Sequence, residues 1–429
     1  MSTVSSSSAA RTLSCTCLIA GGGPAGLMSG YLLARGGIDV IVLEKHADFL
    51  RDFRGDTIHP STMEVLAELG LLERFLARPH QELRYAEGEL GQESVRMADF
   101  THLPTRCKFI GMMPQWEFLD LLAEEARRYT TFRLLMQTEA VELLTEGQRT
   151  IGVQAHSGSQ LLRINAALTI GADGRHSRLR ACAGLQVSDL GAPIDVLWFK
   201  LACGADERPA ALGRIAAGQV LVMLYRGDYL QCALVIPKGM AEQIKAQGLE
   251  AFRARVAQLA GRTSANEIRS LEDVKLLTVR IDRLQRWYKP GLLFIGDAAH
   301  AMSPIGGVGI NLAIQDAVAT ANILAEPLLR GAVRAADLHA VQQRRMFPTR
   351  ATQAMQLAIQ NYILGPVLAS GATPRVPGVV RLMQALPFLQ RIPARVIGMG
   401  FRPEHVHVHL RERQPPGARS LSPPPSLPG

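Results

Sequence analysis

Residues 15–26 read CTCLIAGGGPAG, and this stretch determines how the first part of the chain folds. The apolar run before the glycines predicts a short buried strand, and residues 25–34 (AGLMSGYLLA) have the apolar spacing of a helix. Gly21, Gly23 and Gly26 match the pattern GxGxxG between the two elements. In this pattern the first glycine permits a tight turn, the second admits a pyrophosphate close to the backbone, and the third lets the helix pack on the strand. The stretch therefore predicts a dinucleotide-binding unit.

An acidic residue follows where such a unit needs one. Residues 38–43 (IDVIVL) predict a second buried strand, and Glu44 stands at its end with Lys45 beside it. The Glu44 carboxylate is placed to accept hydrogen bonds from ribose hydroxyls. Pro24 and Ala25 open the preceding helix, whose unpaired N–H groups face the phosphates. We predict that these residues bind the cofactor, with FAD and NAD both open at this point.

The composition is that of a large folded protein. The 429 residues are 47% apolar and 20% charged, which suits two or three lobes with a large core and excludes disordered and fibrous proteins. The net charge of +9 is compatible with anionic ligands or a membrane surface. Lysine-rich blocks interleaved with aromatic residues do not occur, so we expect no nucleic-acid partner. The six cysteines are scattered without metal-ligand spacing, which predicts reduced thiols, a cytoplasmic location and no bound metal.

Later parts of the chain indicate further elements. Ser61 and Glu64 (in STME) predict a capping box at the start of a helix. Residues 195–204 and 218–237 read as longer β runs and predict a separate, mainly antiparallel sheet. After residue 331 the sequence reads helical, with prolines between the segments. The Ser/Ala-rich start and the Pro-rich end of the chain predict disorder.

A second motif, GADGRHSRLR, follows the predicted strand 167–171 (ALTIG). Asp173 can orient the turn that Gly174 permits, while Arg178 and Arg180 offer positive charge to a pyrophosphate. An ordinary strand-to-helix turn capped by Asp173 is the alternative interpretation.

A third motif occupies residues 291–322 (GLLFIGDAAHAMSPIGGVGINLAIQDAVATAN). Gly296 and Asp297 end an apolar strand, and a glycine-rich loop then leads to a helix. The backbone of such a loop can lie against a flat ring, because glycine carries no side chain. The candidate binding residues of this loop and helix start are Pro304, Gly306, Gly307, Gly309, Ile310 and Asn311.

With these three motifs in this order, residues 14–330 resemble the single-component FAD-dependent aromatic hydroxylases, the para-hydroxybenzoate hydroxylase-like flavoprotein monooxygenases. The resemblance implies an α/β fold: a Rossmann-like FAD-binding domain of the GR2 type, an inserted and mainly antiparallel β-sheet substrate domain, and a C-terminal helical region. It also implies that Asp297 contacts the ribityl chain of FAD. The N–H groups of the helix that begins near Gly309 then point at the pyrimidine oxygens of the flavin.

Further site residues follow from the same resemblance. Arg54 stands where the family has an arginine near the FAD phosphates and the mobile flavin, and Gln115 stands where an Arg or Gln meets the ribityl or phosphate region. Val141 is expected to offer its backbone to the adenine. Residues 307–309 read GVG where the family commonly has GQG, which leaves backbone contacts available. For His300, a packing role and a catalytic role both stay open.

The resemblance implies a reaction in which NAD(P)H reduces FAD, O2 forms a flavin C4a-hydroperoxide, and oxygen passes to an aromatic or polyketide-like small molecule. A second GxGxxG is absent from the sequence, which fits a family that binds NAD(P)H without a dedicated domain. The sequence does not identify a catalytic residue; Lys200 either meets a phenolate or faces solvent. Side chains that either line the substrate or fill the core of the second sheet are Trp198, Phe199, Leu221, Met223 and Tyr225.

Several alternatives stay open. A flavin-dependent halogenase would need a WxWxIP segment, which the three tryptophans do not provide. A prenyl-chain reductase of the same superfamily and a non-catalytic FAD-binding protein are the other candidates. Five arginines lie among apolar residues in or beside 351–402, but we favour a capping helical region there over membrane association. The protein is expected to be a monomer or homodimer, and NADH and NADPH are not distinguished.

The predicted organisation is a disordered N-terminus at 1–12, a discontinuous FAD-binding domain at 13–187 and 276–330 with 80–109 on the substrate side, a substrate-binding β domain at 188–275, a helical region at 331–402, and a disordered tail at 403–429.

Overall fold

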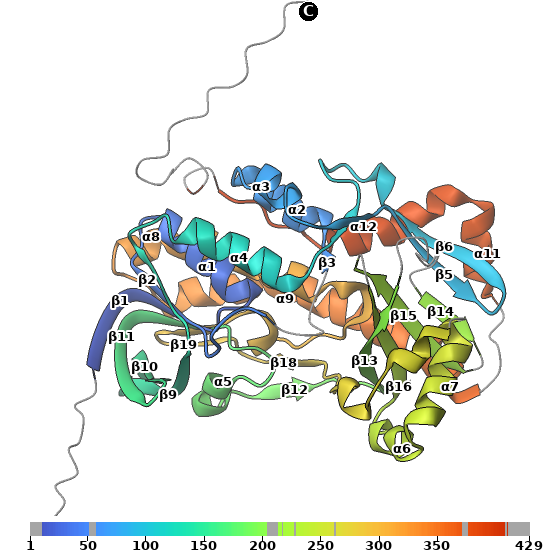
Figure 1. The fold of residues 1–429 in the computed structure, drawn as a ribbon. Helices are drawn as coiled ribbons and strands as arrows, with labels where there is room; N and C mark the ends of the chain where they lie inside the picture. The colour runs from blue at the N-terminus through green and yellow to red at the C-terminus, as the bar shows by residue number, and fades with distance from the viewer. Residues whose placement is uncertain are drawn as a thin grey trace, which may run out of the picture.

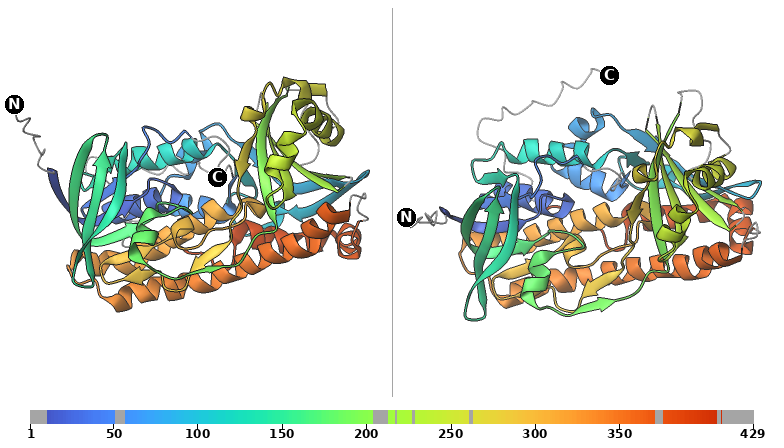
Figure 2. Two further views of the ribbon diagram at one scale, coloured as in Figure 1. Left: turned by 90° about the horizontal axis from the view of Figure 1, so that it is seen from below. Right: turned by 60° about the horizontal axis from the view of Figure 1, so that its bottom comes forward.

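The computed structural model describes residues 11–50, 57–203, 213–216, 218–226, 229–260, 263–370, 376–407 and 410. Two large β-sheets lie in neighbouring halves of the molecule, each packed with helices (Figure 1). The long helix α9 (Ala335–Ile359) runs along one side, from the first sheet towards the second (Figure 2). The two halves are therefore joined by a helical layer as well as by chain crossings.

The first sheet has a parallel centre of five strands. In spatial order they are β20 (Leu292–Phe294), β11 (Gln160–Gly171), β1 (Arg11–Ala20), β2 (Val40–Leu43) and β8 (Phe132–Leu135). The helices packed on this sheet are α1 (Pro24–Arg35), α4 (Gln115–Ala126) and α8 (Gly309–Leu329). All four residues of β2 are buried, which explains its uninterrupted apolar sequence VIVL.

Antiparallel strands extend this sheet beyond β11. They are β9 (Thr138–Glu146) and β10 (Arg149–Ser157), while the short β19 (Tyr288–Lys289) pairs with β20. β11 is long enough, at 12 residues, to pair with β10 and with the parallel strands at once. This meander leads the chain back to the sheet before the second half of the molecule begins.

The second sheet has seven strands. Their order is β17 (Lys275–Leu277), β13 (Ile194–Ala202), β16 (Tyr229–Pro237), β15 (Gln219–Tyr225), β14 (Gly213–Ala216), β5 (Tyr85–Leu90) and β6 (Glu93–Asp99). Every neighbouring pair is antiparallel except β14 and β5. Helices α6 (Ala241–Ala246) and α7 (Leu249–Ala260) pack on one face. The last two strands come from the region around 80–109, far earlier in the chain.

Shorter elements connect the two halves. They are β3 (Thr57–Ile58), α2 (Pro60–Glu68), α3 (Leu72–Leu76), β4 (Gln81–Leu83), β7 (Ile110–Met112), α5 (Arg178–Ala183), β12 (Val187–Asp189) and β18 (Asp282–Leu284). After α9 the chain forms a π-helical turn (Gln360–Leu364), α10 (Gly365–Ser370), α11 (Gly378–Ala385), a 3-10 turn (Pro387–Gln390) and α12 (Arg391–Met399). The predicted α/β class, with an antiparallel second sheet and a helical C-terminal region, is confirmed.

Two boundaries differ from the sequence prediction. β1 begins at Arg11, so the last two residues of the stretch predicted to be disordered, 1–12, belong to a strand. The predicted disorder from 403 is also wrong for 403–407 and 410, where Glu404, Val406 and Leu410 are buried. The reason is a set of long-range contacts, such as that of Arg35, whose Nε donates to the Leu410 carbonyl at 2.6 Å.

One segment within the described part of the chain has the length and composition of a membrane-spanning helix. It covers residues 305–329, and 83% of its most apolar window is buried inside the protein. Since core helices of soluble proteins pass the same test, α8 is accounted for by its packing against α1 and the sheet.

Candidate functional site

The sequence motifs meet at one edge of the parallel sheet. The residues that follow β1, β2, β11 and β20 at this edge are Gly21, Glu44, Asp173 and Asp297. The strand ends are level, because Ala20 pairs with both Leu43 and Gly171, and Gly171 pairs with Phe294. Ligands of doubly wound α/β proteins bind in a crevice at this carboxyl edge. The fold thus brings stretches some 270 residues apart to one place.

The glycine turn has two closed positions and one open position. At Gly21, with φ +110°, an added Cβ would lie 2.3 Å from the Ala172 carbonyl oxygen, and at Gly26 it would lie 1.8 Å from the Gly21 carbonyl oxygen. At Gly23 an added Cβ would meet no atom of the described residues within 4 Å. The first and third glycines are therefore required by neighbouring backbone, whereas Gly23 borders open space at the N-terminus of α1.

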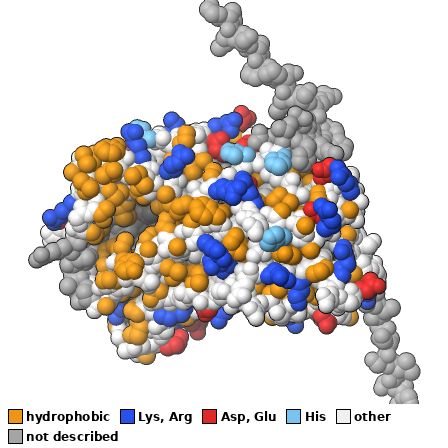
Figure 3. Space-filling view, turned by 180° about the vertical axis from the view of Figure 1, so that it is seen from behind, with side chains coloured by type: hydrophobic (Ala, Val, Ile, Leu, Met, Phe, Trp, Pro, Cys, Tyr) orange, Lys and Arg blue, Asp and Glu red, His pale blue; other side chains and the backbone are white. Residues whose placement is uncertain are grey.

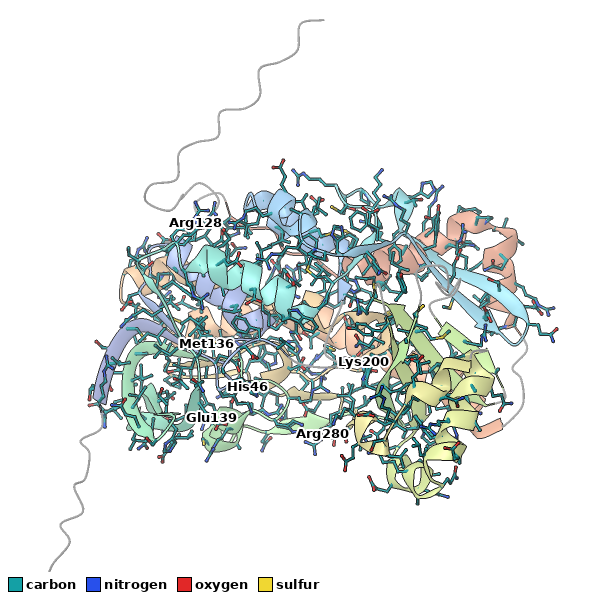
Figure 4. All side chains as sticks on the ribbon, viewed as in Figure 1. His46, Arg128, Met136, Glu139, Lys200 and Arg280 are labelled. Atoms are coloured by element: carbon teal, nitrogen blue, oxygen red, sulfur yellow. The ribbon has the colours of Figure 1, made fainter. Side chains whose placement is uncertain are left out.

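Glu44 is held beside this turn. One carboxylate oxygen accepts from the Gly22 N–H at 3.1 Å, and the other accepts from the His46 N–H at 3.0 Å. The His46 ring Nδ1 lies 2.5 Å from the second oxygen. Lys45 is exposed. Figure 4 places His46 near Met136, the residue that follows β8, so the end of β8 borders the same edge.

The turn after β11 contains two buried polar atoms without a hydrogen-bond partner among the described residues. Asp173 accepts from the Leu179 N–H at 3.2 Å through one oxygen, and its other oxygen, Oδ1, is buried and unpaired. Burial raises the pKa of Asp173. The Arg175 Nη1 is also buried and unpaired within the described part of the chain, while its Nη2 lies 3.3 Å from Asp297. Gly174 supplies the turn with φ +83°. These groups fit a polar ligand at this edge.

The role expected for Arg178 and Arg180 needs correction. Arg180 is buried, and its Nη1 donates to Asp282 at 3.0 Å while its Nη2 donates to the Arg175 carbonyl at 3.0 Å. Arg180 therefore supports the turn from behind instead of offering its charge to a ligand. Arg178 is exposed on the first turn of α5. Motif spacing could not show that the Arg180 guanidinium forms an ion pair with Asp282, about a hundred residues later.

The Gly296–Asp297 turn packs directly on the first turn of α1. Gly296 has φ +57°, and an added Cβ would lie 3.0 Å from the Cβ of Ala25. Asp297 is half-buried, and its one ion pair among the described residues is the one with Arg175. A carboxylate that is partly exposed at a crevice can still accept hydrogen bonds from a bound ligand.

The glycine loop (residues 304–309) approaches α8 with two residues in the left-handed region. Gly306 has φ +77° and Gly307 has φ +63°. The Gly307 carbonyl accepts from Thr57 Oγ1 at 2.9 Å. A Cβ added at Gly307 would lie 2.3 Å from Thr57 Oγ1 and collide with it. At Gly309, the first residue of α8, an added Cβ would have no atom within 4 Å in the part of the chain that the structure describes. Pro304 precedes the turn, and the helix start again borders open space.

Ile310 and Asn311 anchor the start of α8, where both are buried. Asn311 Oδ1 accepts from Ser61 Oγ and Thr62 Oγ1, both at 2.7 Å. This corrects the predicted capping box, because α2 begins at Pro60 with His59 in the cap position, and Ser61 faces α8. Local sequence suggested a cap, but a partner 250 residues away uses the hydroxyl.

Three glutamines of the C-terminal helices hold the segment before the glycine loop. The Gln356 amide accepts from the Ser303 N–H at 3.1 Å and donates to the carbonyls of Ser303 and Ile305 at 2.9 and 3.0 Å. Gln360 donates to Ser303 Oγ at 2.6 Å, and Gln353 donates to the Ala301 carbonyl at 3.0 Å. All three are buried. Sequence reasoning missed this role, although Gln353, Gln356 and Gln360 lie three and four residues apart in a stretch, 351–370, without any charged residue.

His300 belongs to a buried network and has a packing role. Its Nε2 lies 2.6 Å from Asp316 Oδ2, which also accepts from the Gly296 N–H at 3.0 Å. Asp316 Oδ1 accepts from Arg345 Nε at 2.9 Å, and Arg345 Nη1 lies 3.2 Å from Glu404. Burial raises the pKa of Asp316, but the neighbouring His300 and Arg345 outweigh burial, so this pKa is lowered. The network fixes the Gly296 turn from the core side.

His59 links the glycine loop to α12. Its Nε2 lies 3.1 Å from the Gly307 carbonyl and its Nδ1 lies 2.8 Å from the Ile397 carbonyl. Burial lowers the pKa of His59 from 6.5 to about 4, against the effect of these two carbonyls. The neutral ring has one N–H and can donate to only one of them.

We expect the folding stability to decrease as the pH falls from about 6.5 to about 4, because the unfolded chain takes up a proton at His59 before the folded protein does. The pKa difference corresponds to about 3 kcal/mol over this window. Urea unfolding at several pH values should show a smaller loss for His59→Gln, which keeps one donor but does not titrate. Equal pH dependence in the two proteins would contradict this assignment.

The remaining predicted cofactor residues lie at the ends of the same edge or outside the described chain. Gln115 is the first residue of α4 and is half-buried. Val141 sits at a β-bulge of β9, opposite the step from Gln154 to Ala155, and its carbonyl accepts from Cys182 Sγ at 3.7 Å. The bulge frees Val141 from the strand ladder. Arg54 lies outside the described residues.

The candidate substrate side chains divide between the two faces of the second sheet. Phe199, Leu221, Met223 and Tyr225 belong to the core beneath α6 and α7, which faces away from the first sheet. Trp198 lies on the opposite face. Strand alternation could not reveal which face was which. Lys200 is exposed, with its Nζ 5.2 Å from the Tyr229 ring, and Figure 4 shows it at the side of this sheet nearest the first half.

The face of the second sheet that carries Trp198 reaches the glycine loop. A buried cluster contains Val196, Val220 and Val235 from the sheet together with Leu364 and Val367 from the C-terminal region. Ile305 of the glycine loop packs on this cluster, as does Trp198. The sheet face and the loop are thereby fixed side by side.

Comparison with known proteins supports this geometry. The family of FAD-binding domains matches residues 14–355. The 6-methylpretetramide 4-monooxygenase of Streptomyces rimosus is 34% identical over 382 residues, which cover 88% of this chain and 89% of that protein. The rifampicin monooxygenase of Streptomyces venezuelae is 28% identical, over 70% of this chain and 62% of its own length. The solved OxyS anhydrotetracycline hydroxylase from Streptomyces rimosus aligns with a TM-score of 0.72 at 23% identity, over 90% of this chain and 76% of that one.

A carboxyl edge with an open glycine turn, a carboxylate at the end of the second strand and a glycine loop at a helix start fits a dinucleotide-binding protein, and the comparisons make it a flavin-dependent oxidoreductase. The chain belongs to the FAD-binding domain family, within the para-hydroxybenzoate hydroxylase-like monooxygenases. The predicted cofactor FAD, with NAD(P)H as co-substrate, is confirmed at this level.

Proposed function

We propose that this protein hydroxylates an aromatic small molecule of the polyketide type, with NAD(P)H and O2 as co-substrates. The observation that carries the proposal is the contact of Ile305, in the glycine loop, with the apolar cluster of the second sheet that also supports Trp198. A flat apolar molecule that lies on the Trp198 face of the sheet, beside this contact, would lie next to the glycine loop and the flavin edge. A relative that is 34% identical, and 89% of whose length is aligned with this chain, is by its name a 4-monooxygenase of 6-methylpretetramide.

The residues at the carboxyl edge supply binding and orientation. We propose that the α1 N-terminus at Gly23 holds the pyrophosphate, that Glu44 holds the ribose, and that Val141 meets the adenine. Asp297, with the unpaired Arg175 N–H nearby, takes the ribityl chain or phosphates. The bound flavin supplies the activation of oxygen and its transfer to the substrate. The N–H groups at Gly309 and Ile310 favour negative charge on the ring, and the apolar cluster excludes water.

Asp297→Ala is expected to purify without the yellow colour of bound FAD, because the variant loses the carboxylate that accepts from the cofactor and leaves Arg175 unpaired. The absorbance ratio near 450 and 280 nm measures the bound fraction. Asp39→Ala is a matched control, since Asp39 also forms a half-exposed ion pair, with Arg133 at 2.9 Å. It lies at the start of β2, the opposite edge of the sheet. A wild-type flavin spectrum in Asp297→Ala would contradict the assignment.

The proposed reaction is tested by anaerobic reduction of the bound flavin with NADH and with NADPH, each with a panel of phenols, quinolones and polycyclic polyketides. Oxygen is then admitted, and mass spectrometry detects a product one oxygen atom heavier than the substrate. Flavin that no nicotinamide reduces in the presence of any compound would indicate a non-catalytic FAD protein. Product formation with a reduced double bond and no oxygen uptake would indicate a reductase.

A further inference from the structure

The C-terminal helices expose a continuous apolar stripe. Val379 and Leu382 lie on one face of α11, and Leu386 follows directly after this helix, with 64%, 51% and 40% of each residue exposed. Phe388, in the 3-10 turn, and Ile392, on α12, are 56% and 61% exposed. Scattered exposed apolar residues are ordinary, but five of them between residues 379 and 392 mark a surface that contacts something apolar. We call these five residues the apolar stripe.

The inner side of α11 is already used, so the stripe is its free side. Gln384, between the stripe positions, donates to the Arg96 carbonyl at 2.7 Å and accepts from the Arg96 N–H at 3.4 Å. These bonds attach α11 to β6 and fix the stripe facing outwards. Seen from behind, apolar side chains gather around a hollow on the side of the molecule that holds the second sheet, while most charged side chains lie elsewhere (Figure 3).

The charge of this region is one-sided. Between residues 338 and 403 the sequence contains eight arginines and neither aspartate nor glutamate. Arg344 and Arg345 form ion pairs with Glu404. Three further arginines are exposed on the helices of the stripe: Arg381, Arg391 and Arg395. Within the described part of the chain, the carboxylate that pairs with this group is Glu93 of β6, 4.0 Å from Arg381, and both of these side chains are mostly exposed. Asp99 pairs with His102 at 3.6 Å. Arg391 lies 3.3 Å from His102.

We infer that the apolar stripe and its flanking arginines dock this enzyme on a lipid surface that contains anionic headgroups. An amphipathic helix with apolar and cationic residues on its outer side lies in such an interface, with the apolar side chains at the acyl boundary and the cations at the headgroups. A second copy of the chain is a poorer occupant, because a two-fold contact would set the arginines of one copy against those of the other.

Co-sedimentation of the FAD-loaded protein with vesicles tests this inference. We expect binding to phosphatidylcholine vesicles that contain phosphatidylglycerol, weaker binding to phosphatidylcholine alone, and loss of the difference at high salt. Leu386→Glu should reduce binding about tenfold or more, because it places a charge in the apolar contact. Leu276→Glu is the matched control: Leu276 is 42% exposed, against 40% for Leu386, and lies on the edge strand β17.

The outcomes are distinct. Binding that Leu386→Glu loses and Leu276→Glu keeps supports the inference, as does loss in Arg391→Gln with Arg395→Gln. No vesicle binding by the wild type overturns it. A wild type that instead dimerises in light scattering, with Leu386→Glu monomeric, overturns it in favour of self-association. Flavin reduction by NAD(P)H measured without vesicles is a separate readout, so failure here leaves the proposed reaction unaffected.

Discussion

Gly26→Ala should leave a destabilised protein that binds no FAD. The new Cβ would lie 1.8 Å from the Gly21 carbonyl oxygen and 3.4 Å from Ile19 Cγ2. Because the first obstacle is backbone, α1 must move away from β1, at a cost of about 3 kcal/mol or more. Urea unfolding of the FAD-free protein measures the stability, and fluorescence titration measures FAD affinity.

Gly23→Ala separates cofactor binding from folding in the same turn. Gly23 has an extended conformation with φ −75°, and an added Cβ has no described atom within 4 Å. The FAD-free variant should keep its stability within about 0.5 kcal/mol. Its FAD affinity should fall about tenfold or more, because the methyl group occupies the space through which the backbone approaches the pyrophosphate. Wild-type FAD affinity in this variant would place the pyrophosphate elsewhere.

Arg345→Ala should cost about 3–5 kcal/mol of folding stability, because it leaves two buried carboxylates without their shared cation. The Arg345 side chain is 1% exposed and lies 2.9 Å from Asp316 and 3.2 Å from Glu404. Since Asp316 also accepts from the Gly296 N–H, the variant should lose FAD more readily as well. Thermal unfolding with and without added FAD measures both effects.

The adjacent Arg344 provides the control. It contacts the same Glu404 at 2.7 Å, but its side chain is 35% exposed. Arg344→Ala should therefore cost less than about 1 kcal/mol, since water replaces part of the lost interaction. If the two alanine variants lost equal stability, burial of the network would not be the cause.

The sequence was most informative where a role depends on neighbouring residues in the chain. The glycine turn, Glu44 at the end of a strand and the Gly296–Asp297 turn each combine a local pattern with the end of a parallel strand, and parallel strands bring their ends together. The fold class and family follow from that combination.

The sequence was least informative where a partner lies far away. The nearest motif suggests a role for Arg180 and for Ser61, but in the fold each side chain bonds to a distant residue. Arg180 donates to Asp282, and Ser61 donates to Asn311. For the side chains of the second sheet, the sequence left substrate lining and sheet core both open, since alternation gives two faces without saying which one meets the first sheet. Gln356, which supports the glycine loop through the Ile305 carbonyl, belongs to no sequence motif that would predict this role.

The hydrogen bonds between the glutamines of the C-terminal helices and the segment before the glycine loop limit how chimeras of this protein and its relatives can be joined. A chimera joined near residue 331 would exchange Gln353, Gln356 and Gln360 while keeping the Ala301–Ile305 backbone that they hold. A junction beyond residue 364 keeps donor and acceptor in one parent. Chimeras joined near residue 331 would therefore be expected to lose bound FAD. Chimeras joined beyond residue 364 should keep it.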